Sequence, residues 1–292
     1  MTPTETAINV SLKNVLVATD FSLCSFEATR CALGIARRYD STVHLVHVVP
    51  SFGPLPAAQS PEAAMQEISR FAESLLEDGS LSGIAHDVLV TTGDVWSALS
   101  QIIEQKAIDL LVMGTHGRSG LARFVLGSMT ETAIHHASCP VLTIGPGLSQ
   151  FRSSGPPPKI ILFPTDLSEQ TESAAPYAVL FAQKYAAKLI FLHATQQGAA
   201  ASPAVLDRIK SQLRELAKSE GDDLICCPDP VVRKGSPAET ILQVAHEYKA
   251  DLIVFGISVS CREGNHFGLP VAYSVISRAD CPVLTIRALH TW

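Results

Sequence analysis

The sequence predicts an α/β fold of two tandem domains, each an open parallel sheet of five strands with helices on both faces. Short apolar runs alternate with segments in which apolar residues recur every three or four positions, the pattern of strands and covering helices. The pattern then restarts, because Lys159–Ser168 repeats Lys13–Ser22 and Cys281–Ile286 repeats Cys139–Ile144. A chain of 292 residues can hold two domains of about 140 residues each. A repeat of this length indicates duplication of a whole domain.

Five strands are expected in the first domain. Each is a short run of apolar residues, many of them Val, Leu or Ile, bounded by turn-forming residues. Such runs are typical of parallel strands that are buried on both faces. In chain order they are residues 13–20, Thr42–Val49, Asp87–Thr92, Leu110–Met113 and Val141–Ile144.

Four helices are expected between these strands. Met65, Ile68, Phe71, Ala72 and Leu75 have helical spacing, which predicts the second helix. Ser128 is followed three residues later by Glu131, the spacing of a capping box, which predicts the start of the last helix. In chain order the helices are Ser22–Tyr39, Glu62–Leu76, Asp94–Gln105 and Ser128–Ala137.

A Gly, Ser and Pro-rich segment separates the two copies. It has no apolar periodicity and ends in three consecutive prolines, which stiffen the backbone. We therefore assign residues 1–147 to the first domain, 148–158 to a linker and 159–292 to the second domain.

Composition narrows the class of protein. Hydrophobic residues make up 47% of the chain and charged residues 17%, which suits well-buried cores. The net charge of −6 offers no electrostatic basis for binding nucleic acid. No apolar run reaches the ~18 residues that a membrane helix needs, and the polar segment 1–12 does not resemble a signal peptide. Seven cysteines, mostly within apolar patterns, indicate free thiols in a reducing cytoplasm.

The loop after the fourth strand is the strongest candidate for a binding site. It begins Gly114-Thr115-His116-Gly117 and ends Gly127-Ser128, directly before the last expected helix. A helix N-terminus presents unpaired N–H groups and partial positive charge, both of which favour phosphate. Gly117 and Gly127 lack a Cβ, so the backbone there can take a positive φ or approach a ligand closely.

The same spacing resembles a known signature. The pattern G-x2-G-x9-G-S, the opening Val15–Ser22 and the ending Cys139–Ile144 are similar to those of the universal stress protein family. The resemblance covers nearly the whole chain, because the pattern occurs twice. It implies a Rossmann-like fold of the adenine nucleotide alpha hydrolase type. It also implies ATP as ligand, with Mg²⁺ or Mn²⁺.

Strand order follows from the site. Ligands of open parallel sheets bind at the carboxyl ends of strands, where the strand order reverses. Asp20 follows the first strand and Gly114 follows the fourth, so a shared site makes these strands neighbours and gives the order 3-2-1-4-5. That is also the order in the family. The end of the second strand, His47-Val48, would form one wall.

The resemblance also implies roles for individual residues. It places Asp20 and Gly114 near the ribose and the Val48 backbone against adenine. It places Gly117, Gly127, Ser128 and Thr130 around the phosphates, where Arg118 could neutralise charge and His116 could reach the triphosphate. Asp20 could instead serve only as a helix cap, and Arg118 and His116 could be ordinary loop residues. We interpret His47 as a half-buried residue at a strand end rather than a catalyst. The expected ATP-binding residues are Ala18, Thr19, Asp20, Val48, Met113, Gly114, His116, Gly117, Arg118, Gly127, Ser128, Met129 and Thr130.

The second copy departs from the signature. Aligned without gaps, Val259, Leu269 and Pro270 stand in place of Gly117, Gly127 and Ser128. This predicts a degenerate nucleotide site, although Gly264 and Gly268 could support a rearranged loop. The alternative of a metal site in this domain would draw on Cys226, Cys227, Cys261, Glu263 and His266.

The sequence thus favours a cytoplasmic ATP-binding sensor or regulator rather than an enzyme. There is no Walker loop, no H-E-x-x-H motif and no Ser-His-Asp set. Slow ATP hydrolysis, and a second domain that carries a non-nucleotide ligand or a metal, are the alternatives.

The fifth strands predict how the two domains pack. Val141–Ile144 and Val283–Ile286 would be uncharged apolar edge strands, which tend to pair. We expect them to pair with each other across a pseudo-twofold axis. Whether the whole chain also forms a homodimer is left open by the sequence.

Overall fold

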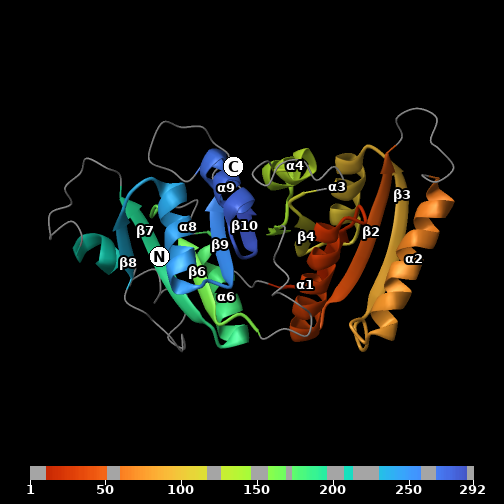
Figure 1. Cartoon of the computed structure of the whole chain (residues 1–292), viewed down its shortest axis with the longest axis horizontal. Coiled ribbons are helices and arrows are strands. Elements are labelled where there is room, and N and C mark those ends of the chain that lie inside the picture. Colours follow the sequence, from red (N-terminus) through yellow and green to blue (C-terminus); the bar gives the residue numbers. More distant parts are fainter. Residues whose placement is uncertain are drawn as a thin grey trace, which may run out of the picture.

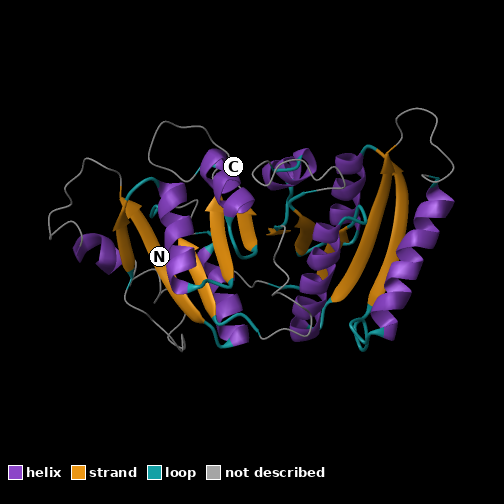
Figure 2. Cartoon of the chain, viewed as in Figure 1, coloured by secondary structure: helices purple, strands orange, loops and turns teal. Residues whose placement is uncertain are grey.

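A computed structural model describes residues 11–50, 60–116, 126–145, 157–168, 173–195, 207–212, 230–257 and 268–287 (Figure 1). Strands and helices alternate along both halves, and helices lie on either side of the strands (Figure 2). The first half contains β1 Asn14–Ala18, α1 Leu23–Tyr39, β2 Thr42–Pro50, α2 Pro61–Glu77, β3 His86–Gly93, α3 Val95–Gln105, β4 Leu110–Gly114, α4 Ser128–His136 and β5 Val141–Ile144. The second half contains β6 Ile160–Pro164, α6 Ala175–Tyr185, β7 Lys188–Thr195, β8 Val231–Lys234, α8 Pro237–Tyr248, β9 Leu252–Ile257, α9 Leu269–Arg278 and β10 Val283–Arg287.

The expected elements of the first half are confirmed. The strand Val141–Ile144 agrees residue for residue, and the other boundaries differ from the expected ones by at most two residues. Ile68, Ala72 and Leu75 of the periodic set are buried in α2, whereas Met65 is 41% exposed.

Strand order places the carboxyl ends of β4, β1 and β2 side by side. The order in the first half is β3-β2-β1-β4-β5 with parallel pairing throughout, which confirms 3-2-1-4-5. The second half repeats it as β8-β7-β6-β9-β10. The two five-stranded sheets are joined edge to edge into a single ten-stranded sheet.

The seam of that sheet is the pairing of β5 with β10. These strands run antiparallel, with Leu142 opposite Leu284 at the centre. The Thr143 hydroxyl donates to the Val283 carbonyl at 3.1 Å, and the Thr285 hydroxyl donates to the Val141 carbonyl at 3.1 Å. These reciprocal bonds follow a pseudo-twofold axis, and they confirm the expected pairing of the two edge strands.

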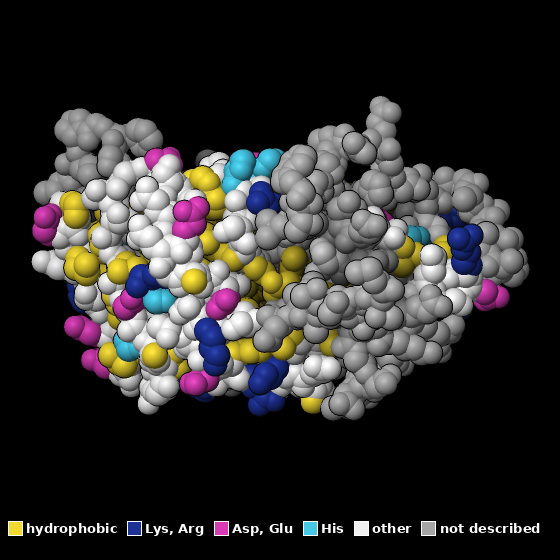
Figure 3. All heavy atoms as spheres, turned by 180° about the vertical axis from the view of Figure 1, so that it is seen from behind, with side chains coloured by type: hydrophobic (Ala, Val, Ile, Leu, Met, Phe, Trp, Pro, Cys, Tyr) yellow, Lys and Arg dark blue, Asp and Glu magenta, His cyan; other side chains and the backbone are white. Residues whose placement is uncertain are grey.

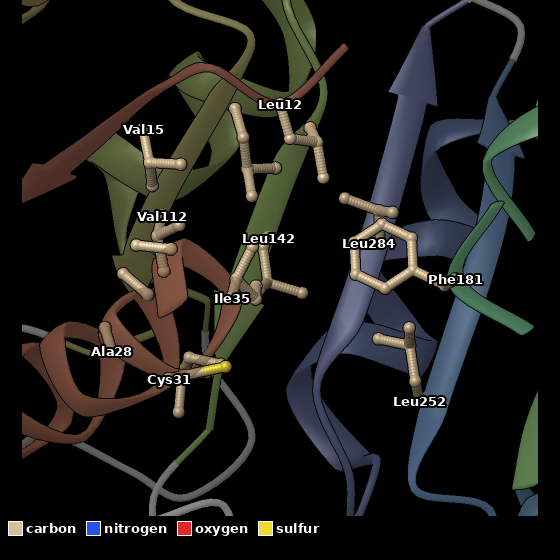
Figure 4. Packing of buried hydrophobic residues seen from close by; sticks show 14 of the residues in the cluster. Leu12, Val15, Ala28, Cys31, Ile35, Val112, Leu142, Phe181, Leu252 and Leu284 are labelled. Carbon is tan, nitrogen blue, oxygen red and sulfur yellow. The ribbon is translucent and has the colours of Figure 1, made fainter. Parts of the chain in front are cut away.

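The hydrophobic core continues across the seam. One buried cluster on the α1 and α6 side of the sheet contains residues of both halves, including Leu142 and Leu284. Figure 4 shows Ile35 and Leu142 of the first half facing Leu284 and Phe181 of the second. At the end of α1, Arg38 Nε donates to the Lys184 carbonyl of the second half at 2.7 Å. The halves are therefore packed together as well as joined by strands.

Charges on the surface are mixed. Figure 3 shows Lys, Arg, Asp and Glu side chains interspersed over the described part of the rear face. No helix among the described residues is long and apolar enough to cross a membrane.

Candidate functional site

A cavity of about 480 Å³ opens at the carboxyl ends of β4, β1 and β2. Its volume falls within the range of small-molecule sites, roughly 300–1,000 Å³. Its position is the point where the chain order of the strands reverses, as expected for an open parallel sheet.

The structure brings together the site residues that it describes. All of them line this cavity: Ala18, Thr19, Asp20, Val48, Met113, Gly114, His116, Gly127, Ser128, Met129 and Thr130. The remaining two expected residues, Gly117 and Arg118, lie outside the described residues.

A tight turn between β1 and α1 presents Asp20 to the cavity. The Thr19 hydroxyl lies 3.0 Å from the Ser25 hydroxyl and accepts the Phe21 N–H at 3.1 Å. Phe21 has a φ of 62°, a left-handed conformation that is uncommon outside glycine. The Asp20 carboxylate accepts the Ser22 N–H at 3.0 Å. The cap of α1 is Ser22, whose hydroxyl accepts the Ser25 N–H, so the alternative in which Asp20 caps the helix is wrong.

The start of α4 differs from the expected capping box. The N-cap is Gly127, with a φ of −67°, and Ser128 is the first helical residue. The Gly127 N–H donates to the Thr115 carbonyl at 3.0 Å, so this donor is already used. The first N–H bonded within the helix belongs to Glu131. Three backbone donors of the first turn, those of Ser128, Met129 and Thr130, therefore stand at the cavity wall without an intrahelical acceptor.

Gly114 is needed for packing at this edge of the sheet. A Cβ at this position would lie 2.7 Å from Cys24 Cβ, 3.0 Å from the Cys24 carbonyl carbon and 3.1 Å from the Ser25 nitrogen. The first turn of α1 can approach β4 this closely only if residue 114 has no side chain. The Thr130 hydroxyl donates to the Gly114 carbonyl at 3.0 Å and ties α4 to the same point.

Two histidines line the cavity. The Nδ1 atom of His47 lies 2.7 Å from the Thr19 carbonyl, and since a carbonyl only accepts, this nitrogen carries the proton. The imidazole packs against the Phe21 ring, with ring centroids 4.5 Å apart and the two planes tilted by 31°. His47 is half-buried at the strand end, as expected. The Nδ1 atom of His116 lies 2.8 Å from the Thr115 hydroxyl, and its Nε2 atom is buried without a hydrogen-bond partner among the described residues.

Helices α2 and α3 supply walls that the sequence analysis missed. Ala64 and Glu67 enter from α2, and Val95 and Leu99 enter from α3. Helical periodicity marks Ala64 and Leu99 as buried, but it cannot say that they border a cavity. Phe21, Ser25, Val46, His47, Val49 and Pro50 complete the lining.

Comparison with known proteins decides the family. A model of the universal stress protein family matches residues 11–145 and again residues 158–287.

The chain belongs to the universal stress protein family.

Relatives agree with this assignment. Universal stress protein MJ0531 of Methanocaldococcus jannaschii is 33% identical over 138 residues, which are 45% of this chain and 81% of that protein. A universal stress protein from Archaeoglobus fulgidus has a similar fold over 94% of this chain and 98% of its own, with a TM-score of 0.68 and 22% identity. Protein PA1789 of Pseudomonas aeruginosa, described as functionally unknown, also has a similar fold. The similarity covers 94% of this chain and 92% of that protein, with a TM-score of 0.65 and 18% identity. These two similarities extend over most of this chain and show its fold.

The second universal stress protein segment keeps one side of the site. The Asp166 carboxylate accepts the Ser168 N–H at 3.0 Å, and Leu167 has a φ of 63°. The Nδ1 atom of His193 lies 2.9 Å from the Thr165 carbonyl. These features repeat those of Asp20, Phe21 and His47, so they belong to the turn of the family fold in both halves.

The other side of the site has changed in the second segment. Helix α9 begins at Leu269 with Gly268 as N-cap, so Gly268, rather than Leu269, takes the capping place of Gly127. Pro270 in the first turn has no N–H, so one of the three backbone donors of α4 has no counterpart. Val259, Gly264 and the expected metal ligands Cys226, Cys227, Cys261, Glu263 and His266 lie outside the described residues.

Burial disfavours the thiolate form of the buried cysteines in the described residues. Burial raises the pKa of Cys31, Cys139 and Cys281 to about 12 in each case. Burial also raises the pKa of Cys24, which lies in the first turn of α1. A thiolate nucleophile at the cavity is therefore not favoured. No group of three or more His, Cys, Asp or Glu side chains within the described ranges could hold a metal ion.

Proposed function

We propose that this tandem universal stress protein binds ATP in the cavity of its first half and acts as a cytoplasmic sensor or regulator of the stress response. The observation that carries the proposal is the convergence of the expected residues from β1, β2, β4 and α4 on one cavity. Three backbone donors at the start of α4, which have no intrahelical acceptor, would form the phosphate-binding end of that cavity.

The arrangement suggests how the nucleotide would lie. The triphosphate would take the N–H groups of Ser128, Met129 and Thr130, together with the Ser128 hydroxyl. Asp20, at the end of the neighbouring strand β1, would accept from ribose hydroxyls. The adenine would lie at the end of β2 against the Val48 backbone, with apolar contact from Met113. Strands in a sheet are about 4.8 Å apart, so β4, β1 and β2 span the length of a nucleoside phosphate.

A divalent cation would come with the triphosphate. Asp20 and Ser128 offer hard oxygen donors in the cavity, but the described residues provide no complete metal site of their own. Mg²⁺ commonly binds nucleotide sites through phosphate oxygens and water, with one or two protein ligands. Mg²⁺ or Mn²⁺ would thus be held mainly by ATP.

Calorimetry with two matched glycine variants tests the site. A Cβ at Gly127 would lie 3.2 Å from the Thr115 carbonyl oxygen and would enter the phosphate end, so Gly127→Val should weaken ATP binding tenfold or more, about 1.4 kcal/mol. Gly268→Val makes the same change at the cap of α9, where the nearest atom would be 3.5 Å away, and should leave ATP affinity unchanged. Titration of the wild type should saturate at about one ATP per chain if the second site is degenerate. Unchanged affinity in Gly127→Val would refute the assignment.

We further propose that the site binds ATP without turning it over at an appreciable rate. The two imidazoles at the cavity are hydrogen bonded to a carbonyl and to a hydroxyl, not to an orienting carboxylate. The His47 contact recurs at His193 in the second half, which favours a structural role. A steady-state assay of phosphate release should therefore match the background rate. Multiple turnovers that are lost in His116→Ala would establish the hydrolase alternative.

A further inference from the structure

The far end of the candidate nucleotide helix is held by the other half of the chain. Arg287, the last residue of β10, donates from Nη1 to the carbonyl of His135 in the last turn of α4 at 2.8 Å. The Tyr273 hydroxyl of α9 lies 3.5 Å from the Glu131 carbonyl, which also belongs to α4. Helix α4 therefore spans from the cavity of the first half to two side chains of the second.

These contacts complement the electrostatics of the helix. The last four carbonyl groups of a helix lack intrahelical donors and carry partial negative charge. The guanidinium of Arg287 is always charged and bonds one of those carbonyls. The opposite end of α4 presents the N–H groups of Ser128, Met129 and Thr130 to the cavity. A cation at one end and phosphate at the other would favour the same placement of the helix.

Among the described residues, the bond from Arg287 to α4 has no equivalent from the first half to the second. Cys281–Ile286 repeats Cys139–Ile144, so the residue in the first half that corresponds to Arg287 is Gly145, which has no side chain. The corresponding helix of the second half, α9, therefore cannot receive this bond from the first half. The half with the altered phosphate end supplies the arginine, and the half with the intact signature receives it.

We propose that Arg287 is a positioning residue for the triphosphate end of the site, and that the second half works as a fixed support for α4. The proposal rests on the proposed function, because it assigns the donors of α4 to phosphate. On this proposal the second half holds α4 in position, a role for which it need not bind a ligand itself.

The test compares ATP with adenosine in the full chain. Arg287→Met removes the charge and the donor but keeps an extended apolar side chain, and Arg287→Lys restores the charge. The matched control is Arg278→Met, because Arg278 is on α9 and pairs with Glu239 at 2.9 Å within the second half. We expect Arg287→Met to weaken ATP binding about three- to tenfold in calorimetry, from the loss of a partly buried cation at the helix end. Adenosine affinity should stay within about twofold of wild type, since adenosine lacks the groups that contact α4.

Two further readouts separate positioning from general destabilisation. Arg287→Lys should recover part of the ATP affinity, and Arg278→Met should keep all of it. Hydrogen exchange in residues 128–136 should become faster in Arg287→Met without any ligand present. Equal losses of ATP and adenosine, or unchanged ATP affinity, would overturn the proposal while leaving the nucleotide site intact. A wild type that binds neither ligand would instead overturn the proposed function, and this proposal with it.

Discussion

Replacing Leu284 with aspartate is expected to unfold the whole chain, and not the second half alone. Leu284 is fully buried and lies opposite Leu142, which is 1% exposed, at the centre of the seam. An aspartate there would place an unpaired carboxylate in an apolar cluster shared by both halves (Figure 4). The cost is about 5 kcal/mol or more, which is comparable to a typical total stability of about 5–15 kcal/mol.

Urea denaturation followed by circular dichroism would measure the effect. Leu284→Met is the matched control, since a swap that conserves volume costs less than about 1.5 kcal/mol. One cooperative transition in wild type, lost in Leu284→Asp and kept in Leu284→Met, would support a continuous core. A Leu284→Asp variant that retains native ATP binding and half of its structure would show that the halves fold independently.

The fold was predictable because burial and periodicity agree along the strands. Val141–Ile144 reads as a buried strand from its composition, and all four of its residues are buried. The repeated Asp before the fourth strand of each half also has a local structural role. Asp109 accepts the N–H groups of Lys13 and Asn14, and Asp251 accepts those of Lys159 and Ile160. The joining of the two sheets could be predicted because β5 and β10 are both apolar edge strands. Antiparallel pairing gives hydrogen-bond partners to the backbone groups of both edges.

The candidate site was predictable only where it lies at strand ends. Asp20, Val48 and Gly114 follow from the rule that parallel strands end at one edge. Ala64 and Glu67 could not be predicted as site residues. Their position at the cavity depends on how α2 packs against the sheet, and periodicity does not specify that packing. The cap of α4 was misplaced by one residue. The spacing of Ser128 and Glu131 fits a capping box, but Gly127, held by the bond from its N–H to the Thr115 carbonyl, is the N-cap, and Ser128 is the first helical residue.

Gly114→Ala is expected to lower both stability and ATP affinity, because one added methyl group meets backbone. The new Cβ would lie 2.7 Å from Cys24 Cβ and about as close to the backbone of Cys24 and Ser25, so the first turn of α1 must move. Overpacking of this kind costs about 1–3 kcal/mol. The same movement would displace Ser25, and with it Thr19, from the wall of the cavity. Gly114, the signature glycine at the end of β4, would then matter first for the approach of α1 and only through that approach for the ligand.

The same substitution elsewhere in α1 provides the matched control. Gly34 lies inside that helix, and a Cβ there would meet nothing within 4 Å. Gly34→Ala should therefore raise stability by about 0.5–1 kcal/mol, because alanine loses less backbone freedom in a helix. Thermal unfolding of the two variants should shift in opposite directions, and calorimetry should show weaker ATP binding only in Gly114→Ala. If Gly114→Ala kept full stability but lost ATP binding, the glycine would be required for close approach of the nucleotide, and the packing argument would be wrong.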